Sequence, residues 1–140
     1  MLANRLFLSG LIMMCLFAVG HLGGFLQAAR AARNDPEMAA LTRAMREHKA
    51  SLLGLRPSIL DFREYFSLNF SILLLLAAVL GFVVLSSTAP EQPAVVRQLS
   101  LVYAVGMLML LGTSVCFSVV QGIIGCLLIA VLFALSYWLT

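Results

Sequence analysis

The last apolar segment of the chain, residues 99–138, limits the possible fold more than any other feature. It runs for forty residues without a formal charge, twice the length that one helix needs to cross a bilayer core of about 30 Å. A backbone inside lipid must satisfy its own hydrogen bonds, which favours helices. The segment must therefore fold back on itself, and Gln121 and Gly122 interrupt it near the middle. We expect two helices, 98–118 and 121–139, joined by a tight hairpin.

Two earlier apolar runs are also long enough to span a membrane, and they predict helices 6–28 and 58–86. The chain is 62% hydrophobic and 11% charged, whereas a soluble domain carries about 25% charged residues. The first run is longer than the apolar core of a usual signal peptide, so we interpret it as a permanent helix. The predicted fold is all-α, a four-transmembrane-helix bundle that forms a single membrane domain over residues 1–140. Gly20, Gly24 and Ala28 predict a seam where a neighbouring helix approaches closely.

The connector between the first two spans carries its own helix signal. Asp35-Pro36-Glu37 offers a capping residue, a proline suited to a first helical turn and an acid near the positive end of the helix dipole. The apolar residues that follow recur at steps of three and four, and Gly54 is a suitable stop. We expect an amphipathic helix over 36–53 that lies on the membrane or caps the bundle. A solvated linker helix is the alternative.

The distribution of basic residues predicts the orientation in the membrane. Seven of the nine lie between the first two apolar runs: Arg30, Arg33, Arg43, Arg46, Lys49, Arg56 and Arg63. The excess of Lys and Arg in cytoplasmic loops places the connector 29–56 in the cytoplasm and both termini outside. No nucleic-acid-binding motif accompanies the cluster, so the expected partner is the lipid bilayer and not a nucleic acid.

Most of the chemically capable side chains lie at the start of the second span. Asp61, Glu64, Tyr65 and Asn69 fall on about half of the helix circumference, and three phenylalanines occupy the rest. Charged and aromatic residues also gather at membrane interfaces as anchors without any catalytic role. Ser58-x-x-Asp61 further fits an N-cap signature, so Asp61 is either a helix cap or a site residue.

His21 and Gln27 are the notable polar groups of the first span. An ionisable group at membrane depth is a functional candidate, although a lone histidine is often only a hydrogen-bonded packing residue. In an antiparallel hairpin, His21 and Asn69 come within about two residues, roughly 3 Å, of the same depth. The cysteines form no C-x-x-C or C-x-x-C-H motif, so we expect neither a thiol relay nor a covalent c-type haem. We also expect no metal site and no cofactor. Haem b on His21 is a weaker alternative, because the other histidine, His48, lies in the connector.

Two segments carry a family resemblance: Gly20-His21 and the run 54–62, which reads Gly-Leu-Arg-Pro-Ser-Ile-Leu-Asp-Phe. The chain loosely resembles small four-helix bacterial membrane proteins that pair a Gly-His in helix one with G-x-x-R-S-Y-W-D-F in helix two. Here Ile59-Leu60 replaces Tyr-Trp, and Pro57 stands at the arginine position. The resemblance implies a location in the bacterial inner membrane. It also implies that His21 and Asp61, with Arg56, belong to one constellation, but it implies no reaction.

Two functions from different classes remain open. The first is an intramembrane acid-base enzyme, an isomerase, cyclase or epoxide-opening enzyme, that acts on a lipophilic substrate. Its acid would be Asp61 or Glu64 and its base His21. The residues assigned to substrate binding are Arg56, Tyr65, Asn69 and Gln27. The alternative is an accessory subunit of a larger membrane complex, or a bundle that binds a lipid or a hydrophobic small molecule; either could form a homo-oligomer. An enzyme predicts a closed cavity, whereas a subunit predicts an exposed polar face on helix two.

Overall fold

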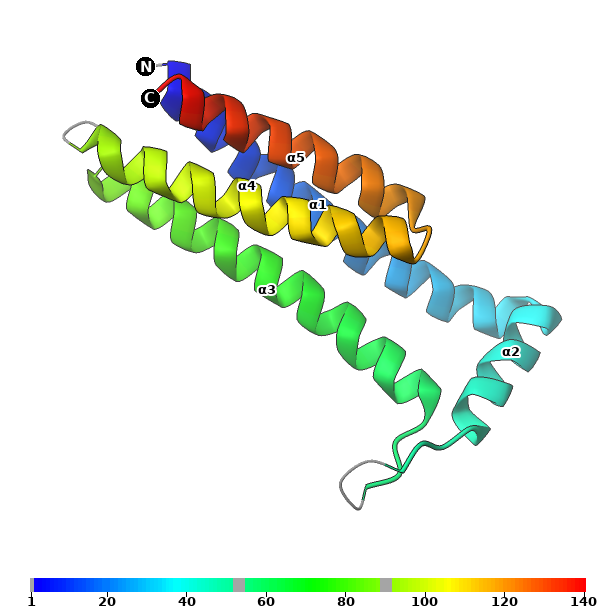
Figure 1. Ribbon diagram of the computed structural model, residues 1–140. Helices are drawn as coiled ribbons and strands as arrows, with labels where there is room; N and C mark the ends of the chain where they lie inside the picture. The colour runs from blue at the N-terminus through cyan, green and yellow to red at the C-terminus, as the bar shows by residue number, and fades with distance from the viewer. Residues whose placement is uncertain (1, 52–54, 89–91) are drawn as a thin grey trace. The chain divides into compact units, whose positions relative to one another are not determined.

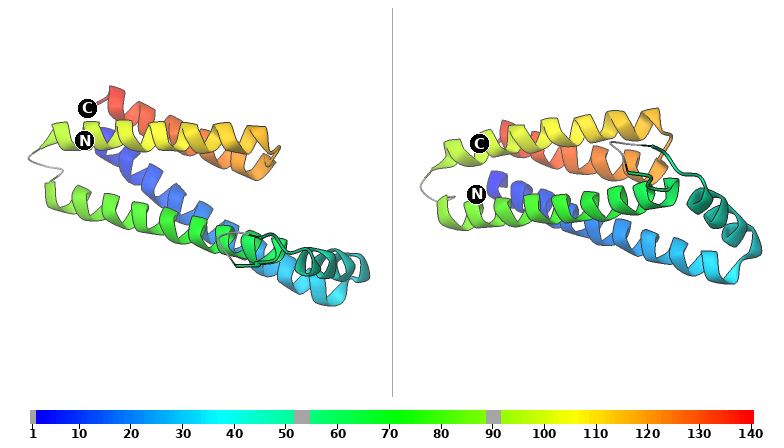
Figure 2. Two further views of the ribbon diagram at one scale, coloured as in Figure 1. Left: turned by 60° about the horizontal axis from the view of Figure 1, so that its bottom comes forward. Right: turned by 90° about the horizontal axis from the view of Figure 1, so that it is seen from below.

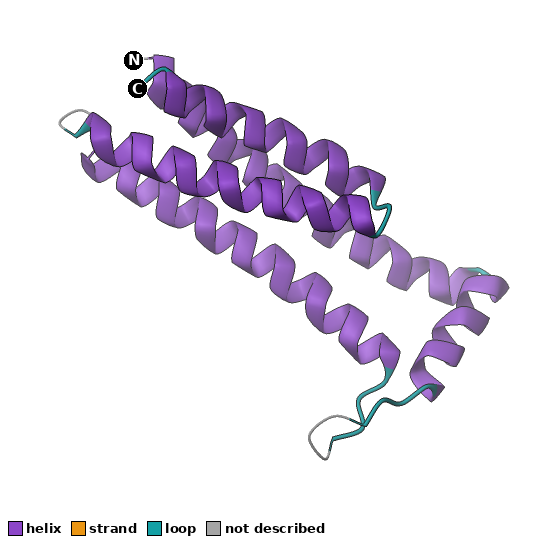
Figure 3. Cartoon of the chain, viewed as in Figure 1, coloured by secondary structure: helices purple, strands orange, loops and turns teal. Residues whose placement is uncertain are grey.

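The computed structural model of the protein describes residues 2–51, 55–88 and 92–140, and the described residues form helices and loops (Figures 1 and 3). The helices are α1 (Leu2–Asn34), α2 (Pro36–Glu47), α3 (Ile59–Thr88), α4 (Pro93–Cys116) and α5 (Val120–Trp138). All of them except α2 are long and apolar enough to cross a membrane. The prediction of an all-α protein with four membrane spans is confirmed, and the chain is a multi-pass membrane protein.

The membrane helices extend further than their apolar runs predict. α1 covers Leu2–Asn34 instead of 6–28, because the alanine-rich segment after Gln27 has a high helix propensity and continues the helix beyond the apolar run. α4 begins at Pro93 instead of 98, since proline fits the first turn of a helix. The ends of α3 and α5 lie within two residues of the predicted ends.

The predicted end of the connector helix was wrong. Asp35 caps α2 as expected, and its carboxylate accepts a hydrogen bond of 2.9 Å from the Glu37 N–H. The helix ends at Glu47 and not at 53, because the next residues pair in an extended conformation with the start of α3. Gly54, the predicted stop, lies outside the described residues.

The chain divides into two compact units, and the membrane helices α1 and α3 each contribute to both. The first unit comprises residues 1–17 and 75–140, where α4 and α5 run antiparallel and side by side (Figure 2). Its core is an aromatic cluster in which Phe7 of α1 lies 5.8 Å from Tyr103 of α4 and 5.4 Å from Phe133 of α5, between ring centroids. The Tyr103 hydroxyl donates a hydrogen bond to the Ala77 carbonyl of α3. This cluster therefore connects all four membrane helices of the unit.

A buried serine pair joins the two ends of the chain within the first unit. The Ser136 hydroxyl of α5 donates to the Ala3 carbonyl of α1 over 3.0 Å, and Ser100 of α4 donates to Ser136 over 3.0 Å. Both serines are fully buried. The contact between Ala3 and Ser136 agrees with an even number of spans, which returns both termini to the same side of the membrane.

The second unit comprises residues 18–74: the end of α1, the whole of α2 and the start of α3. Buried and half-buried positions recur at steps of three and four along both long helices. One such series is Ala18, His21, Phe25, Ala28 and Ala32 on α1, and Leu60, Glu64, Ser67, Ser71 and Leu74 on α3. An average step of 3.5 residues is typical of helices that pack along a common seam. His21 and Glu64 are therefore seam residues of their helices.

The close approach predicted at Gly20 and Gly24 is not formed among the described residues. No atom of these residues lies within 4 Å of the position that a Cβ would take at either glycine. The closely packed glycines lie in the first unit, where a Cβ at Gly10 would lie 2.7 Å from the Phe133 ring and one at Gly125 would lie 2.6 Å from the Phe17 ring. The four-residue spacing of Gly20, Gly24 and Ala28 did not identify the helix face that packs.

Candidate functional site

The first turn of α3 holds Asp61 in a reciprocal capping arrangement with Ser58. The Ser58 N–H donates to Asp61 Oδ2 over 2.8 Å, and the Asp61 N–H donates to Ser58 Oγ over 3.1 Å. Such a pair satisfies two backbone donors that the helix itself leaves without acceptors. The structure shows the helix-cap role that the sequence offered for Asp61, and its role as a site residue stays a prediction.

A short pairing between the end of α2 and the start of α3 brings positive charge to this cap. The Ala50 N–H donates to the Pro57 carbonyl and the Ile59 N–H donates to the His48 carbonyl, each over 3.0 Å. Lys49 and Ser58 form an isolated antiparallel bridge between them. As a result, Arg46 and Lys49 both attract the Asp61 carboxylate. Sequence reasoning did not identify these two residues as its neighbours, because only the bridge brings them there.

His21 contacts α3 through an aromatic residue. Its imidazole is half-buried and lies edge-on to the Phe70 ring, with 5.0 Å between centroids and 70° between planes. Phe70 directly follows Asn69, so the expectation that His21 and Asn69 lie at similar depth agrees with this contact. The Asn69 amide, however, donates to the Tyr65 carbonyl of its own helix over 2.9 Å.

The same contact separates His21 from the two candidate acids. Asp61 precedes Phe70 by nine residues and Glu64 precedes it by six, which corresponds to about 13 Å and about 9 Å along the α3 axis. Side chains on a helix lean toward its N-terminus, so those of two antiparallel helices lean in opposite directions. A general base must lie within direct hydrogen-bonding reach of its proton, or one water away. The structure therefore does not bring His21 and Asp61 together as a proton-transfer pair.

The remaining candidate residues are mostly exposed. Tyr65 is 62% exposed, and its ring lies 5.6 Å from that of Phe66, between centroids. The exposed candidates are Gln27, Arg56, Asp61 and Tyr65, whereas His21, Glu64 and Asn69 are half-buried. One continuous exposed stripe of α3 contains two of them: Asp61, Tyr65, Leu68 and Ile72. We refer to these four residues as the α3 stripe.

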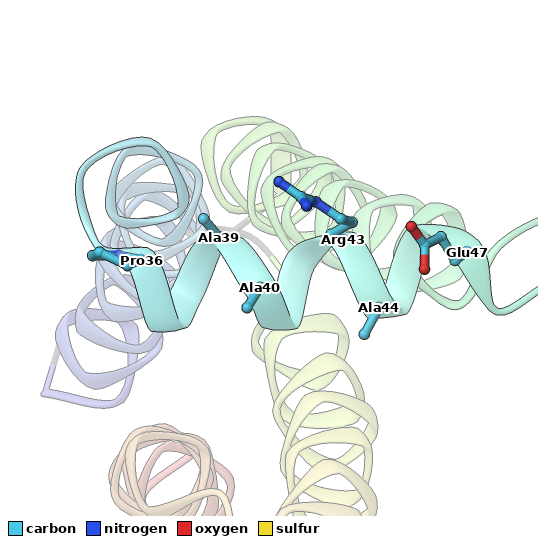
Figure 4. A pocket seen from close by; sticks show the side chains of 6 residues that line it. All are labelled: Pro36, Ala39, Ala40, Arg43, Ala44 and Glu47. Atoms are coloured by element: carbon cyan, nitrogen blue, oxygen red, sulfur yellow. The ribbon is translucent and has the colours of Figure 1, made fainter.

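The structure also shows an open hollow along α2. It is lined by Pro36, Ala39, Ala40, Arg43, Ala44 and Glu47 (Figure 4). In this view Arg43 and Glu47 lie along the upper edge of the α2 ribbon, and Ala40 and Ala44 lie along its lower edge. None of the residues that we assigned to catalysis or substrate binding lines this hollow. Ala40 and Ala44, four residues apart in the sequence, are the small residues that leave this part of α2 open.

Comparisons with protein-family models, with curated proteins and with solved structures found no match to this chain. The family resemblance at Gly20-His21 and at residues 54–62 therefore stays a prediction.

Proposed function

We propose that the protein is a non-catalytic accessory subunit that docks against a larger membrane complex through the α3 stripe. The observation that carries this proposal is the exposure of Asp61, Tyr65, Leu68 and Ile72 at steps of four, three and four residues. This is the spacing of positions along a helix–helix interface. The stripe also combines an acid and an aromatic hydroxyl with aliphatic side chains, a composition that suits a protein partner with hydrogen-bonding groups.

The composition of the stripe distinguishes it from a surface that only meets lipid. On α4, the exposed large side chains include Val102, Val105 and Leu108, which are purely aliphatic. Tyr65 presents a hydroxyl as well as an apolar ring, and buried tyrosines usually place that hydroxyl against a partner. Aromatic anchors of this kind are also enriched at the centres of protein interfaces. A transmembrane helix of another protein would satisfy the Tyr65 hydroxyl and cover Leu68.

The acid-base enzyme is the competing proposal, and the geometry gives it less support. A general acid must hold a proton, whereas the Ser58 N–H that Asp61 Oδ2 accepts stabilises the ionised carboxylate. His21 contacts Phe70, and the candidate acids lie about 9 to 13 Å from that level along the helix. An isomerase, cyclase or epoxide-opening enzyme would need these groups to converge on one substrate.

Site-specific photocrosslinking in native membranes tests the docking proposal. A benzophenone side chain is introduced in turn at Tyr65, Leu68 and, as a matched control, Val102, which is 66% exposed on α4. We expect one discrete protein adduct, heavier than a dimer of this chain, from positions 65 and 68, and lipid adducts alone from position 102. Lipid adducts alone from all three positions, or an adduct of two copies of this chain, would contradict the proposal.

A further inference from the structure

The C-terminal half of α2 and the segment directly after it present a group of exposed basic side chains. Arg43, Arg46 and Lys49 are all exposed, and among the residues that the structure describes they form no ion pair. We refer to these three residues as the α2 basic group. The nearby acids are Glu47 on the same helix and Asp61, so three positive charges face two negative ones. The group therefore keeps a local excess of positive charge.

The position of α2 in the chain places this charge at a membrane surface. α2 lies between the end of one membrane span and the start of the next, and both ends are on the same side because the spans run antiparallel. α2 has no buried residue, and Leu41 on it is 52% exposed. A helix with an apolar side and a charged side in this position lies along the layer of lipid headgroups.

We propose that the α2 basic group binds the phosphate groups of anionic phospholipids in the leaflet that contacts α2. Arginine donates paired N–H bonds to phosphate oxygens, and lysine adds a point charge. Arg43 also lines the hollow of α2, where Ala39, Ala40 and Ala44 offer a shallow apolar surface beside it (Figure 4). A phospholipid fits this combination, since its phosphate meets Arg43 while its glycerol and first acyl carbons cover the alanines. The proposal is independent of the accessory-subunit function, because it uses a different surface.

Native mass spectrometry of the full chain tests this proposal directly. The protein is released from mixed vesicles that contain phosphatidylcholine and phosphatidylglycerol in equal amounts, and the lipids that remain bound are counted. We expect retained phosphatidylglycerol to exceed phosphatidylcholine. The double variant Arg43→Gln/Arg46→Gln should reduce this preference by about fivefold for each charge removed, as expected for basic residues near an anionic surface. Equal retention of both lipids by the unaltered protein would overturn the proposal.

Two control variants separate a local site from net charge and from misfolding. Arg5→Gln/Arg97→Gln removes the same charge at two exposed positions outside the connector, and it should leave the lipid preference unchanged. Arg43→Lys/Arg46→Lys keeps the charge and should keep most of the preference, even if the glutamine variant fails to fold. An equal loss in the Arg5→Gln/Arg97→Gln variant would overturn a site on α2.

Added inorganic phosphate identifies the source of the bound phosphate group. At matched ionic strength, it should displace no more phosphatidylglycerol than sodium chloride does, because the lipid also contacts the alanine surface. Selective displacement by inorganic phosphate would show that the group takes a free anion, and the lipid assignment would then fail.

Discussion

The imidazole of His21 on α1 lies edge-on against the ring of Phe70 on α3, with 5.0 Å between ring centroids. This contact fixes the antiparallel register of the two helices in the second unit. In the first unit, Leu11 of α1 lies against Gly81 of α3. Facing residues of two antiparallel helices keep a nearly constant sum of residue numbers, and the sums for these two pairs differ by one. The same register therefore holds within each unit, and His21 lies in a packing contact between α1 and α3.

Replacing His21 should lower stability through lost packing. His21→Ala removes the edge-on ring contact and is expected to destabilise the protein by about 1 kcal/mol, the usual contribution of an aromatic pair. His21→Phe keeps an aromatic ring and should retain most of the stability. Thermal unfolding in detergent measures both variants, with His48→Ala in the exposed connector as the control. Equal losses in His21→Ala and His21→Phe would show that the imidazole nitrogens, and not the ring, hold the contact.

The capping pair at the start of α3 predicts a non-additive mutation series. Ser58→Ala should cost about 1 kcal/mol, as is typical for the loss of an N-cap side chain. Asp61→Ala should also lower the unfolding temperature, and Asp61→Asn should restore part of the loss because an amide oxygen still accepts the Ser58 N–H. Ser58→Ala/Asp61→Ala should lose less than the two single losses combined, since both residues serve one cap. Strict additivity in the double-mutant cycle would contradict a shared cap.

The two classes of glycine in the chain should respond in opposite ways to a methyl group. Gly10→Ala places a Cβ 2.7 Å from the Phe133 ring and should destabilise the protein by about 1–3 kcal/mol through overpacking. Gly24→Ala meets no described atom within 4 Å and should stabilise its helix by up to about 1 kcal/mol. Thermal unfolding of both variants under the same conditions gives the comparison. A loss in Gly24→Ala as large as that in Gly10→Ala would indicate a close neighbour at Gly24.

The long membrane helices and the start of α2 could be predicted from local signals. The length of the apolar runs predicted four spans. Asp35-Pro36-Glu37 predicted the start of α2, because each capping interaction lies within three residues. The end of α2 could not be predicted in this way. The end depends on the bridge between Lys49 and Ser58, which are nine residues apart in the sequence. Lys49 pairs in this bridge and so does not continue the helix.

The candidate site was harder to predict, because residue type does not reveal which helix face packs. Asp61 and Tyr65 share a polar face with Glu64, yet Glu64 lies on the half-buried seam while the other two are exposed. The distance between His21 and Asp61 depends on the register of α1 against α3, which a single sequence does not contain.

The orientation of the protein can be tested with single cysteines in a background that lacks Cys15, Cys116 and Cys126. Ala44→Cys on α2 should react with a membrane-impermeant thiol reagent only after the cells are opened, because the basic connector is expected in the cytoplasm. Ala94→Cys, at the exposed start of α4, lies on the opposite side by span order and should react in intact cells. Labelling of Ala44→Cys in intact cells would reverse the predicted orientation.

The most direct test of the accessory-subunit proposal is the size of the assembly that contains the chain, measured by native gel electrophoresis after mild detergent extraction from its own membranes. We predict that the unaltered chain migrates in a complex much larger than a dimer. Tyr65→Ala/Leu68→Ala should release it to the size of the isolated chain, and Val102→Ala/Leu108→Ala on the exposed surface of α4 should leave the complex intact. Migration of the unaltered chain at its own size, or an intact complex with Tyr65→Ala/Leu68→Ala, would contradict docking through the α3 stripe.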